Sequence, residues 1–248
     1  MSHRLAVAGG SAAVGAAAAL GLPELAPVSS GCRRLLDLTD RLPDRRTVAL
    51  TFDDGPHPEG TARVLDFLAE TGIRATFFLV GEQVARWPGL AAQVARAGHV
   101  IGLHGYEHRT LPGRAARELD DDWNRAVDTI ASATGREPTL YRPPRGMFTY
   151  RSLAAARNRG LQPVLWAADG RDWRRSATAA SICRRIASRL QGGEVILLHD
   201  ADHYAAPGSW RDTVAALPLL TGELRVRGLV PVALGAESPG VVGEDCAV

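Results

Sequence analysis

Two adjacent aspartates and two histidines four residues apart have the types and spacing for chemistry at a metal ion. Asp53 and Asp54 end an apolar run in TFDDGP, and His104 and His108 stand in HGYEH. On one helical turn, histidines at i and i+4 share a face, with Cβ atoms about 6 Å apart. Two histidines and one aspartate leave coordination positions open for water and substrate, which is typical of a hydrolytic site. An HxxxH pair alone is more often two unrelated histidines, so the prediction depends on the carboxylates.

The adjacency of Asp53 and Asp54 predicts two different roles for them. Neighbours in a regular strand point to opposite faces, and two ionised carboxylates side by side repel each other. The turn at Gly55 and Pro56 allows the backbone to leave strand geometry, so that both carboxylates face one site. One then binds the cation while the other acts as a base toward the attacking water. The alternative is an Asx turn at the strand end, for which one aspartate would suffice.

A third histidine, His199 in ILLHD, follows another apolar run. This position suits a general acid, although a single histidine there is more often a packed core residue.

The segments that must position these side chains alternate between two periodicities. The β-rich runs are TVALTF, RATFFLV, HVIGL, TLYR, PVLWA, EVILL and LVPVAL. Between them lie helical patterns, such as the repeat of Leu119, Trp123, Val127 and Ile130. This alternation predicts an α/β fold with a parallel sheet and right-handed crossovers. About seven strands could close as a (β/α) barrel or stay open as a doubly wound sheet, and the lack of GxGxxG or P-loop motifs favours the barrel.

Polar residues follow the strand runs where each one ends. They are Asp53 and Asp54 after the first run, His104 and His108 after the third, Arg142 and Arg145 after the fourth, Asp169 and Asp172 after the fifth, and His199 and Asp200 after the sixth. The C-terminal ends of barrel strands carry the loops from which barrel enzymes assemble their active sites. We therefore expect these side chains to gather at one face.

The composition excludes some classes of protein. The chain has 248 residues, 46% hydrophobic and 23% charged, which is enough to bury the core of one large or two small globular domains. The net charge of +2 and the lack of a basic stripe with interleaved aromatic residues argue against a nucleic-acid partner. The three cysteines show neither a disulfide framework nor metal-site spacing.

The N-terminal sequence has the pattern of an export signal. Arg4 precedes an apolar stretch from Leu5 to Leu22, which the small-residue run PVSSGC follows. Three outcomes stay open: cleavage, acylation of Cys32, or retention as a membrane anchor. In each case we expect an exported protein, extracellular or associated with the cell envelope. The predicted organisation is a signal or anchor at 1–31, a linker at 32–46, the globular domain at 47–234 and a flexible tail at 235–248.

Six segments in this order resemble the five motifs of the NodB-type polysaccharide deacetylases, carbohydrate esterase family 4. They are TFDDGPHPEGT, RATFFLVG, GHVIGLHGYEH, YRPPRG, DGRDW and VILLHD. The resemblance covers roughly Thr47 to Leu234, and ordered agreement of several motifs is far more specific than any one of them. It implies a distorted (β/α) barrel. It also implies metal-dependent removal of N-acetyl groups from a peptidoglycan-like or chitin-like glycan, giving acetate and a free amino sugar.

The resemblance also implies a role for each matching residue. Asp53 would be the base held by Arg142, and His199 the general acid oriented by Asp172. The metal, usually Zn²⁺ or another divalent ion such as Co²⁺, would be bound by Asp54, His104 and His108. The backbone N–H of Arg145 would bind the oxyanion, and Trp173 and Tyr106 would contact substrate. Gly105 departs from the family pattern, which has Ser or Thr there, and lacks a side chain to stiffen the metal loop.

Three other functions are alternatives to N-deacetylation. An O-acetyl esterase acting on a xylan-type polymer would use the same residues, and only a substrate assay separates the two. A glycan-binding pseudoenzyme would have lost catalytic residues, and none is missing. A glycosidase needs carboxylates on opposite sides of a glycosidic bond, which adjacent Asp53 and Asp54 do not supply. We expect a monomer that acts on an acetylated glycan, with possible membrane association through its N-terminus.

Overall fold

The computed structural model describes residues 21–235 of the chain. Within them, eight parallel strands form one sheet. They are β1 (Thr47–Asp53), β2 (Thr76–Leu79), β3 (Val100–Leu103), β4 (Leu140–Tyr141), β5 (Gln162–Pro163), β6 (Ala168–Asp169), β7 (Val195–His199) and β8 (Val230–Val232). The strand order is β5-β4-β3-β2-β1-β7-β6, and β8 pairs with β1 outside this path.

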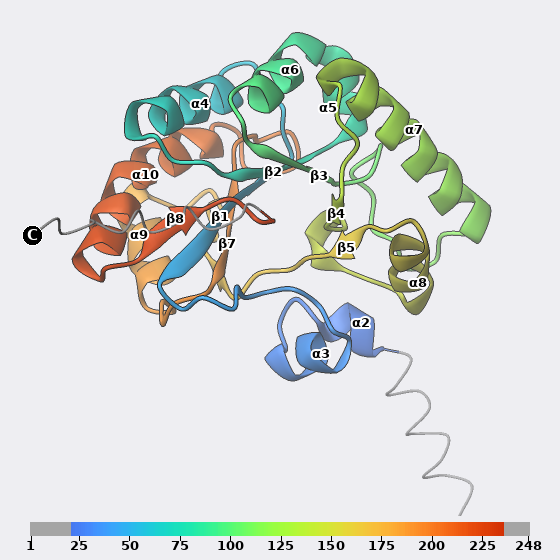
Figure 1. The fold of residues 1–248 in the computed structure, drawn as a ribbon, viewed down its shortest axis with the longest axis horizontal. Coiled ribbons are helices and arrows are strands. Elements are labelled where there is room, and N and C mark those ends of the chain that lie inside the picture. Colours follow the sequence, from blue (N-terminus) through green and yellow to red (C-terminus); the bar gives the residue numbers. More distant parts are fainter. Residues whose placement is uncertain (1–20, 236–248) are drawn as a thin grey trace, which may run out of the picture.

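Helices surround the curled sheet on its outside (Figure 1). The described helices are α2 (Leu22–Leu25), α3 (Ser30–Leu35), α4 (Gly60–Thr71), α5 (Gly81–Arg86), α6 (Pro88–Arg96), α7 (Ala116–Thr134), α8 (Tyr150–Asn158), α9 (Ala179–Ala187) and α10 (Ser209–Val226), with a short 3₁₀ turn η1 (Pro144–Gly146). This is the predicted distorted (β/α) barrel, with seven strands along its main path.

The burial of the strands explains their near-continuous apolar sequence. Every residue of β1 is buried, as expected for a parallel strand covered on both faces. On the helical side, α7 buries Leu119, Trp123 and Ile130, which confirms the predicted helical periodicity. A rigid sheet with buried strands fixes the positions from which the loops at its C-terminal edge begin.

The run PVLWA is not the single strand predicted from sequence. β5 lies at its start and pairs with β4, whereas β6 begins just after it and pairs with β7. Since β5 and β6 stand at opposite ends of the strand order, the chain between them crosses from one edge of the sheet to the other. Along the way Val164 donates its N–H to Tyr141 and Ala167 donates to Val195. These residues hydrogen-bond to both edges, which explains why a β-like sequence forms no continuous strand.

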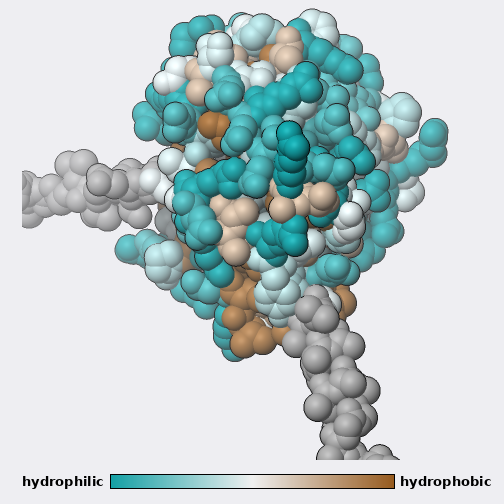
Figure 2. Space-filling model, turned by 90° about the vertical axis from the view of Figure 1, so that its right-hand side faces the viewer, coloured by the Kyte–Doolittle hydropathy of each residue, from teal (hydrophilic) through white to brown (hydrophobic). Residues whose placement is uncertain are grey.

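The described part of the predicted leader and linker is folded. Helices α2 and α3 lie beside β5 and α8 (Figure 1), and Cys32 in α3 is only 8% exposed. The Arg33 side chain donates to the carbonyl of Ala26 at 2.8 Å. Figure 2 shows a mostly hydrophilic face with a hydrophobic patch at its lower edge.

The apolar run before residue 21 and the predicted tail after residue 235 lie outside the described residues. Between residues 21 and 235, no helix combines the length and the apolar character needed to cross a membrane.

Candidate active site

A cavity of about 310 Å³ lies at the C-terminal ends of the strands. It is lined by Asp53, Asp54, His104, His108, Arg145, Gly146, Trp166, Trp173, Leu197, His199, Tyr204 and Ala205. The structure therefore brings together seven of the ten site residues predicted from sequence. Of the other three, Arg142 and Asp172 lie behind residues of the cavity, and Tyr106 lies elsewhere.

Both aspartates of TFDDGP face this cavity because the backbone leaves strand geometry at Asp54. Asp53 ends β1 in extended conformation, whereas Asp54 has a φ of 77°, in the left-handed region. This turns the Asp54 carboxylate to the same side as that of Asp53. Gly55 is required next to them, because a Cβ there would lie 2.5 Å from Oδ2 of the buried Asp200.

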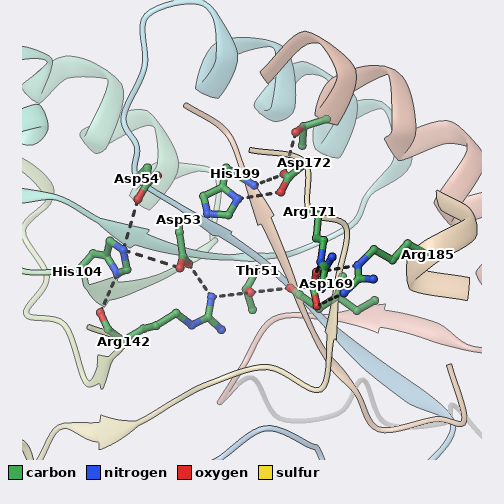
Figure 3. A network of polar contacts seen from close by, with 12 residues as sticks. Thr51, Asp53, Asp54, His104, Arg142, Asp169, Arg171, Asp172, Arg185 and His199 are labelled. Carbon is green, nitrogen blue, oxygen red and sulfur yellow. Dashed lines mark hydrogen bonds and ion pairs between the residues drawn. The ribbon is translucent and has the colours of Figure 1, made fainter. Parts of the chain in front are cut away.

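A buried arginine holds Asp53 in place. Arg142 Nη1 donates to Asp53 Oδ1 at 2.6 Å and to Thr51 Oγ1 at 2.9 Å (Figure 3). Its Nη2 donates to the carbonyl of Leu165 at 3.1 Å. Because Arg142 is fully buried and donates to three partners, its guanidinium has one orientation. Asp53 is thereby kept as an oriented carboxylate, and its other oxygen, Oδ2, which lies 3.9 Å from His104 Nε2, can accept a proton.

Asp54, His104 and His108 form a cluster that fits a divalent cation. Asp54 Oδ1 lies 3.4 Å from His104 Nε2 and 3.3 Å from His108 Nε2, and within the described residues this buried oxygen has no hydrogen-bond partner. His104 Nδ1 donates to the Arg142 carbonyl at 2.7 Å, so the neutral tautomer of this ring has its lone pair on Nε2. Burial lowers the pKa of His108 to about 4 despite the Asp54 charge, so this imidazole is neutral at neutral pH. Two imidazole nitrogens and one carboxylate oxygen are a zinc ligand set with open positions.

The i, i+4 spacing predicted that the two histidines lie on one helical turn, and this prediction is wrong. They follow β3 in a loop, where Gly105 has a φ of 87°. The Asp122 carboxylate on α7 accepts the N–H groups of Tyr106 at 2.9 Å and Glu107 at 3.2 Å. The loop that carries the histidines is thus held by α7, without a side chain at position 105.

A second set of possible metal ligands consists of His57, Asp202 and His203. The proton on the His57 ring makes this set unsuitable for a cation. His57 Nδ1 accepts the N–H of Gly60 at 2.9 Å and that of Glu59 at 3.2 Å. The neutral ring must then carry its proton on Nε2, the atom that faces Asp202 at 3.4 Å. This group is a hydrogen-bonded cluster.

On another side of the cavity, Asp172 orients His199. Asp172 Oδ1 accepts from His199 Nδ1 at 2.9 Å, and its Oδ2 accepts the His199 backbone N–H at 2.7 Å. Thr213 on α10 donates to the same Oδ2 at 2.9 Å. Burial by itself lowers the pKa of His199, but the charges of Asp172, Asp54 and Asp53 outweigh it and raise this pKa to about 10. His199 is therefore protonated at neutral pH, and its Nε2–H remains available to a bound molecule.

Aromatic rings form other parts of the wall. Trp173 meets the His199 ring edge-on, with centroids 5.3 Å apart, and also lines the cavity. Trp166 and Tyr204 also line the cavity, and neither was predicted. Trp166 belonged to the β-rich run PVLWA, and Tyr204 lies in the loop after the LLHD motif, so no sequence signal separated them from ordinary strand or loop residues.

Two sequence predictions do not match the positions found. Tyr106 is buried away from the cavity, with its ring 3.7 Å from the Arg125 guanidinium carbon and packed against Gly81, so its position does not support a substrate contact. Asp169, expected among the residues of the active face, instead pairs with Arg185 on α9 at 2.9 Å and does not line the cavity.

The Arg145 backbone has the conformation of a turn that presents an N–H group. Its φ is 60°, within η1. None of the hydrogen bonds among the described residues uses the Arg145 N–H. A free backbone donor beside a ligand cluster suits the binding of a developing oxyanion.

Several known proteins are similar to this chain in sequence and in fold. A family model described as polysaccharide deacetylase matches residues 40–164. A peptidoglycan-N-acetylglucosamine deacetylase of Bacillus cereus is 34% identical over 187 residues, which cover 75% of this chain and 84% of the relative. A chitooligosaccharide deacetylase of Azorhizobium caulinodans is 32% identical over 192 residues, with 75% and 91% covered. The structure of the Bc1960 peptidoglycan N-acetylglucosamine deacetylase matches with a TM-score of 0.74 at 30% identity, covering 79% of this chain and 90% of that chain.

Proposed function

The chain belongs to the polysaccharide deacetylase family, carbohydrate esterase family 4, and on that basis we propose that it is a metal-dependent N-deacetylase of an acetylated glycan. The supporting observation is the arrangement around the cavity. The ligand cluster of Asp54, His104 and His108 lies beside a carboxylate held by Arg142 and an imidazolium held by Asp172. A base, an acid and a cation site that share one cavity suit amide hydrolysis.

Each residue of the site has a separate role in the proposed reaction. A cation held by Asp54, His104 and His108 would polarise the acetyl carbonyl and make water more acidic. Asp53 takes the proton of the water that attacks the carbonyl carbon, and the Arg145 N–H donates to the oxyanion that forms. His199 then gives its Nε2 proton to the nitrogen, since an amine leaves poorly unless it is protonated. The C–N bond breaks, giving acetate and a free amino sugar.

The substrate proposed is an N-acetylated polysaccharide or oligosaccharide, peptidoglycan or chitin-like. The rings of Trp166 and Trp173 in the cavity wall give it the apolar surface on which a sugar ring packs. The test is acetate release by the Zn²⁺-loaded protein from peptidoglycan, chitooligosaccharides and acetylated xylan. We expect release from at least one N-acetylated glycan. Release from acetylated xylan alone would show an O-acetyl esterase, and release from none would refute the proposal.

Replacing Asp172 should affect amide and ester substrates differently. Asp172→Asn removes the charge that keeps His199 protonated, so hydrolysis of the amide should fall, by about 10²–10⁴-fold if general-acid catalysis is lost. Hydrolysis of an activated acetate ester should fall much less, because its leaving group departs without a proton. The measurement is kcat for both substrates with the wild type and the variant. Equal losses on the two substrates would contradict the acid role of His199.

The rate of amide hydrolysis should decline at alkaline pH, because His199 acts only in its protonated form. Because the pKa of His199 is raised, the protonated form stays populated through neutral pH. It is lost as the pH rises through this pKa. Since a bound cation adds positive charge to the cavity, we expect the alkaline limb of the kcat profile below pH 10, the value of the cation-free site. In Asp172→Asn the limb should move to lower pH. A limb that stays in place would exclude His199 as its source.

The proposed location is outside the cytoplasmic membrane, where acetylated wall or environmental glycans are found. The support is the apolar run after Arg4. Cell fractionation should recover the protein in the envelope or medium, and a cytoplasmic protein that retains Met1 would rule this out.

A further inference from the structure

We propose that Tyr204 is the positioning residue for the metal ligand His108, and that metal affinity depends on its ring. The two rings stack with centroids 4.1 Å apart and planes inclined by only 10°. Tyr204 comes from the loop between β7 and α10, far in sequence from the histidine loop. The inference rests on the proposed function, because it assumes that Asp54, His104 and His108 hold a cation.

The two histidine ligands are supported in different ways. His104 has the support usual for a metal-binding imidazole, since its Nδ1 donates to a backbone carbonyl. His108 makes no such bond: among the described residues, no hydrogen bond to its Nδ1 is formed. The next residue after His104 is Gly105, which has no side chain to offer one. The orientation of the His108 ring therefore depends on contacts with its face, and Tyr204 supplies the parallel stacking contact.

Tyr204 is itself fixed by the first turn of α5. Its hydroxyl donates to the Glu82 carboxylate and accepts from Gln83 Nε2 at 2.9 Å. The same turn also holds the histidine loop, because the Gly81 N–H donates to the Gly105 carbonyl at 2.9 Å and the Glu82 N–H donates to the Tyr106 carbonyl at 2.9 Å. One helix end thus positions both the loop that carries His108 and the ring that lies on it.

The ring and the hydroxyl of Tyr204 contribute separately to the position of His108, and two variants distinguish these contributions. Tyr204→Leu removes the ring, whereas Tyr204→Phe keeps the ring and removes the hydroxyl that ties it to α5. Loss of an outer support of a metal ligand typically costs about 10–100-fold in metal affinity. We expect a loss of that size in Tyr204→Leu and a smaller one in Tyr204→Phe.

The experiment is a titration of the chelator-stripped full-length protein with Zn²⁺ alone, in competition with a chromophoric chelator. The wild type, both Tyr204 variants and Trp173→Leu are compared. Trp173→Leu is the matched control, because it removes a ring of the same cavity that lies against His199 and not against a metal ligand. Its Zn²⁺ affinity should stay at the wild-type value. Thermal unfolding of each stripped variant verifies that it is folded before its affinity is compared.

Excess Zn²⁺ should restore acetate release in Tyr204→Leu to the extent that it restores occupancy. An unchanged Zn²⁺ affinity in folded Tyr204→Leu would overturn the inference, and so would an equal loss in Trp173→Leu. If the wild type binds no divalent cation, the metal dependence of the proposed function fails, and this inference fails with it. Binding in the wild type with no change in the Tyr204 variants refutes the inference alone.

Discussion

Asp53→Asn should lower kcat for deacetylation by about 10²–10⁴-fold, the usual contribution of a general base, while the cation stays bound. The carboxylate that takes the water proton is lost, but an amide oxygen can still accept from Arg142 Nη1, which now lies 2.6 Å from Asp53 Oδ1. Asp53 is not one of the three clustered ligands, so added metal should not restore the rate. The measurement is acetate release at saturating substrate over a range of Zn²⁺ concentrations.

Asp169→Asn is the matched control for Asp53→Asn. It also removes a carboxylate paired with arginine, here Arg185 at 2.9 Å, but it lies outside the cavity. Its kcat should match that of the wild type. Because Arg142 is fully buried, Asp53→Asn leaves a less well compensated charge, and its thermal unfolding must show that the variant is folded. A folded Asp53→Asn protein with a near wild-type rate would exclude Asp53 as the base.

Asp54→Asn, in contrast to Asp53→Asn, should lose the metal. Its buried Oδ1 lies within 3.4 Å of both histidine Nε2 atoms, and an amide oxygen gives a cation much less charge than a carboxylate. Loss of a residue that only supports a metal ligand typically lowers the metal affinity by about 10–100-fold, so loss of the ligand Asp54 should lower it at least as much. Metal content of the purified variant should fall, and excess Zn²⁺ should restore part of the activity.

The roles of the two aspartates would be reversed if Asp54→Asn kept its metal and Asp53→Asn lost it. If neither variant changed in metal content or rate, TFDDGP would be only a turn at the end of β1. Both measurements are needed, because a loss of activity alone does not distinguish a missing base from a missing cation.

The sequence predicted most of the site because strand ends in a parallel sheet share one edge. Once the apolar runs were assigned as strands, Asp53, His104 and His199 had to lie near one another, whatever the details of the loops. The contact of Arg142 with Asp53 was implied only by the family resemblance, because β4 and β1 are not neighbours in the sheet. The prediction that these side chains gather at one face needed only the common direction of the strands.

The remaining features depend on contacts that spacing does not encode. Thr213 reaches Asp172 from α10, and Tyr204 reaches His108 from a loop without a motif. Trp166 faces the cavity because its segment crosses between the two sheet edges, which its β-like sequence does not reveal. The direction of Tyr106 is set by the positive φ of Gly105 and by the bonds to Asp122, which the match to the family motif does not reveal.

The most direct test of the central claim is acetate release by chelator-stripped wild-type protein as Zn²⁺ is added back. The account predicts that the stripped protein is inactive on an N-acetylated glycan, and that activity rises to a plateau when the cluster of Asp54, His104 and His108 has bound one cation. Full deacetylation by protein whose measured metal content is negligible would contradict the account.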